Sequence, residues 1–148
     1  GISSSKSIVA QSAGNDVGDF AHLWIDGVDL APNGVGYNLV ALEATGVVLA
    51  RQSFNTLATT DEAQTMAAWL QQWPPGTIIA GAVRDEASNK LSEEAVQALN
   101  TIGVATDLRG RFRWSHAFIG VVGAPPGSAV EAGAHQPDRR RGHGYDRP

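Results

Sequence analysis

The alternation of apolar and polar residues divides the chain into a strand-rich first half and a second half in which helices and strands alternate. Short alternating patches at residues 7–13 and 20–26 predict two strands, because successive side chains on a strand point to opposite faces. The Asp26-Gly27 pair that ends the second patch is typical of a tight turn. The chain is therefore expected to begin with strands.

The strongest strand signals are two neighbouring runs, at residues 37–43 and 47–54. The connection between them is short and ends in Gly46, a residue that accepts the backbone conformations of tight turns. The two runs therefore predict an antiparallel hairpin.

Helical spacing replaces this alternation after residue 54. Apolar residues recur at steps of three and four from Ala63 to Trp73. Thr59 followed by Glu62 is a capping-box signal for the start of a helix, and the Pro-Pro-Gly run at 74–76 ends it. One amphipathic helix is therefore expected in this region.

The remainder of the chain predicts strand, helix and strand. The apolar run 77–83 indicates a buried strand, Ser92 can cap a second helix that Gly103 ends, and residues 117–122 form the last strand. A strand-rich segment followed by helix, strand, helix and strand indicates an α+β fold.

Composition and charge are those of one globular domain. The 148 residues are 43% hydrophobic and 18% charged, with a formal net charge of −4. An acidic body argues against nucleic-acid binding, and no apolar run approaches the roughly 18 residues of a membrane span. The chain has no cysteine, which excludes disulfides and thiolate chemistry.

Three segments follow from this composition. Residues 1–6 are Ser-rich and are expected to be a flexible N-terminal segment, residues 7–124 form the domain, and residues 125–148 form a Pro-, Gly- and Arg-rich tail or linker. Three tail residues could ligate a metal but fit no closed-site spacing: His135, Asp138 and His143. We therefore expect neither a metal nor another cofactor.

Two further kinds of chemistry have weak signals. The glycine pairs within 34–36 and 120–123 do not open a helix, so they do not predict a phosphate site. Ser115 and His116 are neighbours on a predicted strand and should point to opposite faces, so a packed imidazole is a better interpretation than a catalytic dyad.

One acidic pair has no ordinary explanation in a turn or a helix start. Asp85 and Glu86 come at the end of the most buried predicted strand, at the head of a polar loop. Ser88 and Asn89 in the same loop are expected to line the rim of a site with Glu86. Adjacent carboxylates rarely flank a glycosidic bond as hydrolysis requires, so this pair favours binding over catalysis.

The segment 108–114 alternates arginine with aromatic residues just before the last strand. Arg113 offers a guanidinium with fixed hydrogen-bond geometry, and Phe112 and Trp114 offer faces on which a ring can stack. A solvated loop anchored by Phe112 explains the pattern equally well.

Five segments together resemble the interleukin-like EMT inducer family, also called the GG or PANDER-like domain, and the stem domain of protein O-mannose N-acetylglucosaminyltransferase. They occur in the family's order over about residues 7–123. The segments are 36–46, 51–56, 75–79, 83–88 and 112–120.

This resemblance implies two twisted, mainly antiparallel β-sheets in a sandwich-like arrangement, flanked by two or three short helices. It also implies an extracellular or cell-surface module that binds glycans, among them N-acetylglucosamine-containing ones, with Asp85 as the binding acid and Arg113 as the binding arginine. The chain departs from the family at residues 114–116, which affects sugar preference.

Two alternatives to a carbohydrate-binding module stay open on the sequence. One is a structural or protein-interaction module that self-assembles as a homo-oligomer or docks a partner through its sheet edges. The other is an enzyme such as a glycoside hydrolase, which we consider the weaker alternative because the catalytic motifs sought are absent from the sequence.

Overall fold

The computed structural model of the chain describes residues 4–16 and 18–134. Eight strands and two helices occur in this part. In chain order they are β1 (Ile8–Gly14), β2 (Phe20–Ile25), β3 (Val28–Asp29), β4 (Gly36–Leu42), β5 (Val48–Phe54), α1 (Thr60–Gln71), β6 (Ile78–Asp85), α2 (Glu93–Asn100), β7 (Ser115–Val121) and β8 (Val130–Ala134). The α+β class predicted from the sequence is confirmed.

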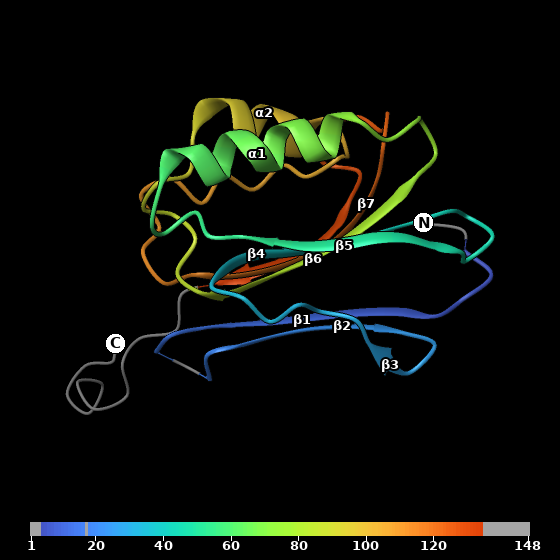
Figure 1. Ribbon diagram of the computed structural model, residues 1–148, viewed down its shortest axis with the longest axis horizontal. Coiled ribbons are helices and arrows are strands. Elements are labelled where there is room, and N and C mark those ends of the chain that lie inside the picture. Colours follow the sequence, from blue (N-terminus) through green and yellow to red (C-terminus); the bar gives the residue numbers. More distant parts are fainter. Residues whose placement is uncertain (1–3, 17, 135–148) are drawn as a thin grey trace.

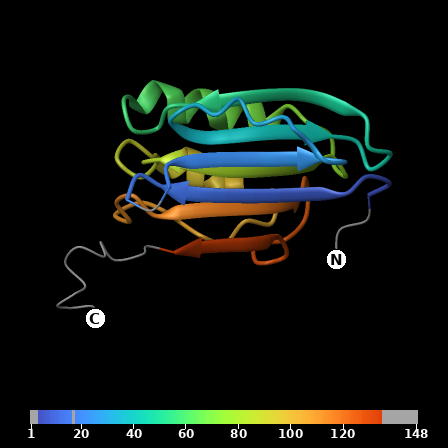
Figure 2. The ribbon, with the colours of Figure 1, turned by 90° about the horizontal axis from the view of Figure 1, so that it is seen from below.

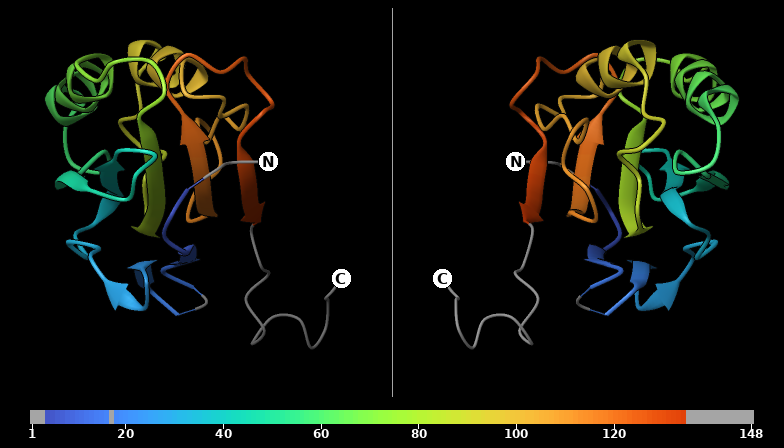
Figure 3. Two further views of the ribbon diagram at one scale, coloured as in Figure 1. Left: turned by 90° about the vertical axis from the view of Figure 1, so that its right-hand side faces the viewer. Right: turned by 90° about the vertical axis from the view of Figure 1, so that its left-hand side faces the viewer.

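The elements form three layers. Figure 1 shows α1 and α2 on one face of the layer that contains β4, β5, β6 and β7, with β1, β2 and β3 beneath the other face. The side views of Figure 3 show the same order, with the small layer under only part of the larger one. The expected sandwich-like arrangement is therefore present, with both helices on one side.

Strand β6 connects the two strand layers. It pairs antiparallel with β4 along its length, antiparallel with β7 over Ile78–Ala82, and parallel with β1 at Arg84 and Asp85. The hydrogen bonds therefore join all eight strands into one open, mixed sheet that folds into two layers.

Strand β4 explains why there are two cores. Tyr37 and Leu39 pack with the helices, whereas Val40 and Leu42 pack against the small layer. Every residue of β4 is buried, as expected for a strand covered on both faces.

The local signals for turns and helix starts are confirmed. Asp26 and Gly27 both have positive φ, of 49° and 80°, and connect β2 to β3. The Thr59 side chain accepts a hydrogen bond from the amide of Glu62, but the Glu62 carboxylate accepts one from Asn55 instead of closing the capping box. Neither α1 nor α2 combines the length and apolarity needed to cross a membrane.

Strand β8 lies in the segment that the sequence analysis assigns to the tail. It pairs antiparallel with β7, and Glu131 ties it to the domain. The Glu131 carboxylate accepts hydrogen bonds from the amides of Ala105 (2.7 Å) and Thr106 (3.3 Å) and lies 2.8 Å from Nε2 of the fully buried His116. His116 is thus a packed imidazole. Residues 135–148, with the tail's histidines and arginines, lie outside the described residues.

The Glu131 contacts predict a specific pH dependence of stability. Burial alone would raise the pKa of Glu131, but hydrogen bonds from His116, Ala105 and Thr106 outweigh it and lower the pKa from 4.5 to about 2. A depressed folded-state pKa contributes stability that is complete above pH 4.5 and is lost as the pH falls toward about 2. In Glu131→Gln, the free energy of unfolding should therefore fall less between about pH 5 and about pH 3 than in the wild type.

Urea denaturation at several pH values measures this slope. Glu94→Gln, which removes an exposed carboxylate on α2, should keep the wild-type slope. Parallel pH profiles for the wild type and Glu131→Gln would show that this carboxylate does not stabilise the fold.

Candidate binding site

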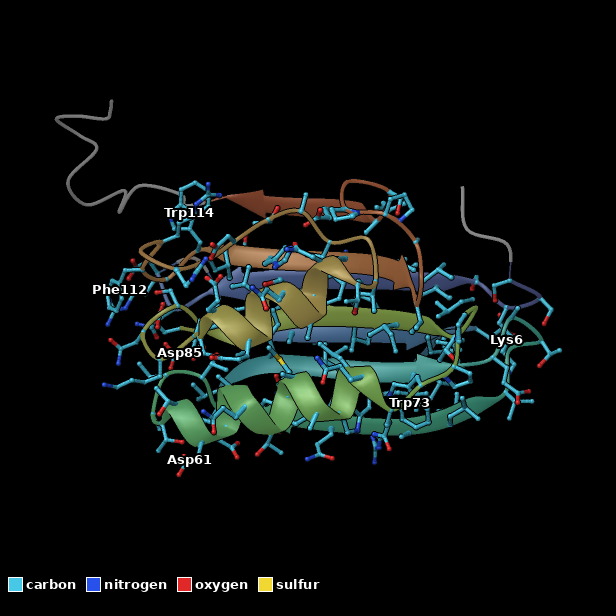
Figure 4. The ribbon with its side chains drawn as sticks, turned by 90° about the horizontal axis from the view of Figure 1, so that it is seen from above. Lys6, Asp61, Trp73, Asp85, Phe112 and Trp114 are labelled. Carbon is cyan, nitrogen blue, oxygen red and sulfur yellow. The ribbon has the colours of Figure 1, made fainter. Side chains whose placement is uncertain are left out.

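The predicted site residues lie at one end of the molecule, where β6 ends beside the β1–β2 loop and the loop before β7. Figure 4 shows Asp85, Phe112 and Trp114 at this end, with Lys6 at the opposite end. The site is therefore built from three segments that are far apart in the sequence.

Gly14 allows these segments to converge. It pairs with Asp85 in the short parallel contact between β1 and β6. A Cβ atom at Gly14 would lie only 2.0 Å from the carbonyl oxygen of Arg113 and 3.5 Å from that of Asp85. Because glycine has no Cβ, the backbone of Arg113 can lie against the end of β1. The backbones of Asp85 and Arg113 are thereby brought to the same end of the molecule.

Asp85 and Arg113 both have a left-handed backbone, with φ of 63° and 60°. Aspartate tolerates this region, whereas for arginine it costs on the order of 1 kcal/mol. Such positions persist only where surrounding contacts hold them, and they cluster at functional sites. The surrounding structure therefore fixes the backbone positions from which the Asp85 and Arg113 side chains project.

The Asp85 carboxylate is half-buried and has free acceptor capacity. Burial and then the charge of Asp19 raise its pKa, while Arg113 and Arg84 lower it in part. Among the described residues, no donor is hydrogen-bonded to this carboxylate. It is therefore free to accept hydrogen bonds from a ligand.

Arg113 is held in place on two sides. Its Nη1 lies 3.0 Å from Oδ1 of Asp16, and the centre of its guanidinium lies 4.7 Å from the centroid of the Phe112 ring. Its Nε is buried without a partner among the described residues. The sequence analysis missed Asp16, because the contact of its loop with Arg113 spans 97 residues and depends on the pairing of β1 with β6.

The two aromatic residues differ in exposure. Phe112 is 56% exposed, with the Arg113 guanidinium over one face of its ring. Trp114 is half-buried against the helix-side core, and the Arg111 guanidinium lies 4.8 Å from the centroid of its ring. Phe112 therefore presents the larger free surface for stacking.

Glu86 and Ser88 are buried and do not line the rim as expected, whereas Asn89 is exposed. Oε1 of Glu86 accepts hydrogen bonds from Ser88 N (3.0 Å), Ser88 Oγ (2.6 Å) and Arg113 N (3.1 Å), and Oε2 accepts one from Asn89 N (2.8 Å). A buried carboxylate needs such donors to offset its desolvation. Glu86 therefore shapes the loop and holds the backbone of Arg113.

A metal-based site has no support in the described part of the chain. Within residues 4–16 and 18–134, no group of three or more His, Asp or Glu side chains is arranged to hold a metal ion. The nearby carboxylates Asp16 and Asp19 are paired with Arg113 and Arg84 instead.

The fold and the site define a small mixed β domain with helices on one face and an Asp- and Arg-bearing end. Residues 35–124 match the Interleukin-like EMT inducer family, and the chain belongs to this family. The resemblance seen in the sequence is therefore confirmed, and Asp85 and Arg113 both lie in the matched segment.

Two curated relatives share part of the chain. Cell migration-inducing and hyaluronan-binding protein from Mus musculus is 32% identical over 86 residues, and the protein of the same name from Homo sapiens is 31% identical over 87 residues. The matches cover 58% and 59% of this chain but 6% of each relative. The chain thus corresponds to a small portion of these proteins.

The contacts of Glu86 predict the effect of removing its charge. In Glu86→Gln, an amide nitrogen would replace one oxygen and face backbone donors. The free energy of unfolding should fall by about 1–3 kcal/mol, because buried donors lose their acceptor. Hydrogen exchange at the amides of Ser88, Asn89 and Arg113 should become faster.

Denaturant unfolding and amide exchange measure these two effects. Glu94→Gln on the surface of α2 is the matched control and should change stability by less than about 0.5 kcal/mol. Equal effects of the two substitutions would contradict a positioning role for Glu86.

Proposed function

We propose that this domain is a non-catalytic carbohydrate-binding module that works outside the cell or at its surface. The observation that carries the proposal is the convergence of Asp85 and Arg113 beside the exposed ring of Phe112. Membership of the Interleukin-like EMT inducer family and similarity to proteins named for hyaluronan binding also support a glycan ligand.

The three groups suit the chemistry of a sugar. A carboxylate such as Asp85 can accept hydrogen bonds from two hydroxyl groups, and a guanidinium such as Arg113 donates them. The apolar face of a sugar ring can pack on an exposed aromatic ring, for which Phe112 is available and Trp114 lies nearby. Glu86 and Ser88 support this site indirectly, because their hydrogen bonds hold the backbone of the loop after β6 and of Arg113 in place.

The charges at this end favour a neutral ligand. Asp16 and Asp19 already pair with Arg113 and Arg84, and Asp85 adds a further carboxylate. These three carboxylates would repel a polyanion such as hyaluronan, and Arg111, which stacks on Trp114, would offset this repulsion only in part. We therefore favour neutral glycans, and the resemblance to the transferase stem domain suggests a terminal N-acetylglucosamine.

Binding is favoured over hydrolysis because of Glu86. Glycoside hydrolysis needs two carboxyl groups on opposite sides of the scissile bond. Glu86, the neighbour of Asp85, is 1% exposed and its oxygens accept four hydrogen bonds. It is therefore not available to a substrate as an acid, base or nucleophile.

A self-assembling module is a second candidate, because β5 forms an exposed edge of the larger strand layer. In the described part of the chain, β5 pairs with β4 alone, and Val47, Val48 and Leu49 are 53%, 37% and 38% exposed. An unpaired edge with apolar residues can pair with another chain. Sedimentation velocity in sugar-free buffer would detect homo-oligomers, and a monomer at high concentration would argue against this candidate.

Calorimetric titration with N,N′,N″-triacetylchitotriose tests the carbohydrate proposal. Asp85→Ala and Arg113→Ala should each weaken binding at least about tenfold, because each removes charged hydrogen bonds to the sugar. A hyaluronan hexasaccharide should bind more weakly than the neutral sugar.

Glu94→Ala and Arg51→Ala remove an acid and an arginine elsewhere on the surface and should bind as the wild type does. Circular dichroism of all four variants checks that they are folded. Wild-type affinity in both site variants would rule out this site. Turnover of the sugar would show that the domain is an enzyme and not a binding module.

A further inference from the structure

A second open surface lies on the face opposite the helices, beside β1. Strand β1 pairs with β2 on one edge, and on the other edge it pairs with β6 only at Ala13 and Gly14. Among the described residues, no strand pairs with this second edge between Ile8 and Ser12. Seen from below in Figure 2, β7 and β8 (orange and red) lie beside β1 and no strand of the small layer covers them.

Three hollows follow this edge from end to end, and we call them together the β1 slot. The first hollow is lined by Lys6, Ile8, Ile119 and Val130, among others. The largest of the three has a volume of about 420 Å³. Adjacent hollows share lining residues, so the slot is continuous. Its apolar lining consists mainly of small or branched side chains: Ile8, Ala10, Ala117, Ile119, Val130 and Ala132.

The slot lies where one additional strand would fit beside β1. Neighbouring strands lie about 4.8 Å apart and packed layers about 10 Å apart, so one added strand beside β1 would lie beneath β7 and β8. The same edge of β1 already accepts a strand where β6 pairs with Ala13 and Gly14. Ala117 and Ala132 leave room for side chains from below, and Val130 on the same face is 58% exposed.

The lining favours a peptide over a sugar or a folded second copy. An unpaired strand edge offers backbone donors and acceptors at the spacing of an extended peptide. The Lys6 end of the slot has no aromatic lining residue, Phe118 is only 1% exposed, and Phe20 in the largest hollow is the remaining aromatic residue of the lining. An edge strand of another folded copy would bring its own packed layers toward β7 and β8, whereas a single extended peptide would not.

Lys6 adds a preference for charge at one end. It lines the slot and forms no ion pair with a described residue. From Ile8 to Ser12 the edge is about 13 Å long, and Lys6 lies just before β1, so a peptide of about six or seven residues can extend from Ser12 past Ile8 to Lys6. An acidic residue at the end of such a peptide would lie near the Lys6 ammonium.

We propose that the β1 slot binds an extended segment of a partner protein as a fourth strand of the β1–β2–β3 layer. The segment has alternating side chains, small or branched ones toward β7 and β8 and polar ones toward solvent, with an acidic residue at Lys6. None of the residues proposed for the glycan site lines the slot, so the two proposals can be tested independently.

Two synthetic seven-residue peptides of alternating Thr and Val provide the probes, one with Glu and the other with Lys at both ends. Titration into the ¹⁵N-labelled chain should shift the amides of residues 8–12 and 130–133, and slow hydrogen exchange on β1. The Glu-ended peptide should bind at least about threefold more tightly than the Lys-ended one, because of Lys6.

Four variants sharpen the result. Lys6→Glu should reverse the preference between the two peptides, and Ala132→Phe should abolish binding of both by filling the slot. Gln52→Phe, which places the same side chain on the exposed strand β5, should bind as the wild type does. Asp85→Ala should also keep peptide binding, which separates this proposal from the glycan site.

The proposal fails if millimolar peptide leaves residues 8–12 unchanged, or if the shifts map to β5. It also fails if exchange at residues 8–12 slows with rising protein concentration in the absence of peptide. That result would identify a second copy of the chain as the occupant.

Discussion

The structure depends on strand β6, because one of its edges pairs with two different strands. Over Ile78–Ala82 that edge pairs with β7, and at Arg84 and Asp85 it pairs with β1. Ser12 occupies the point of division, where its hydroxyl accepts a hydrogen bond from the amide of His116 (3.0 Å) and donates one to the carbonyl of Val83. This hydroxyl replaces the bond that β6 and β7 would otherwise make, so the division leaves these groups satisfied.

The division has consequences on both sides of Ser12. Beyond it, the end of β1 lies against Asp85 and Arg113, which requires the glycine at position 14. Before it, the edge from Ile8 to Ser12 pairs with neither β6 nor β7 and has no strand partner among the described residues. The candidate glycan site and the slot are therefore two results of one feature of strand pairing.

Sequence reasoning succeeded where a feature depends on neighbouring residues. Alternation and helical spacing located the strands and helices, and Thr59 and Ser92 cap α1 and α2 as their positions suggest. It failed where long-range pairing decides the outcome. Strand β8 has a weak alternating pattern and is held by β7 and by the hydrogen bonds of Glu131.

The burial of Glu86 shows the same limit at the site. A carboxylate beside a polar loop ordinarily faces water, and only the folded arrangement brings four donors to it. Because one of these donors is the amide of Arg113, the loop after β6 and the loop before β7 fix each other. Asp16 holds the guanidinium of the same residue from a third segment. The polar groups at this end are thus ordered before any ligand arrives, and a ligand that meets them loses less conformational entropy on binding.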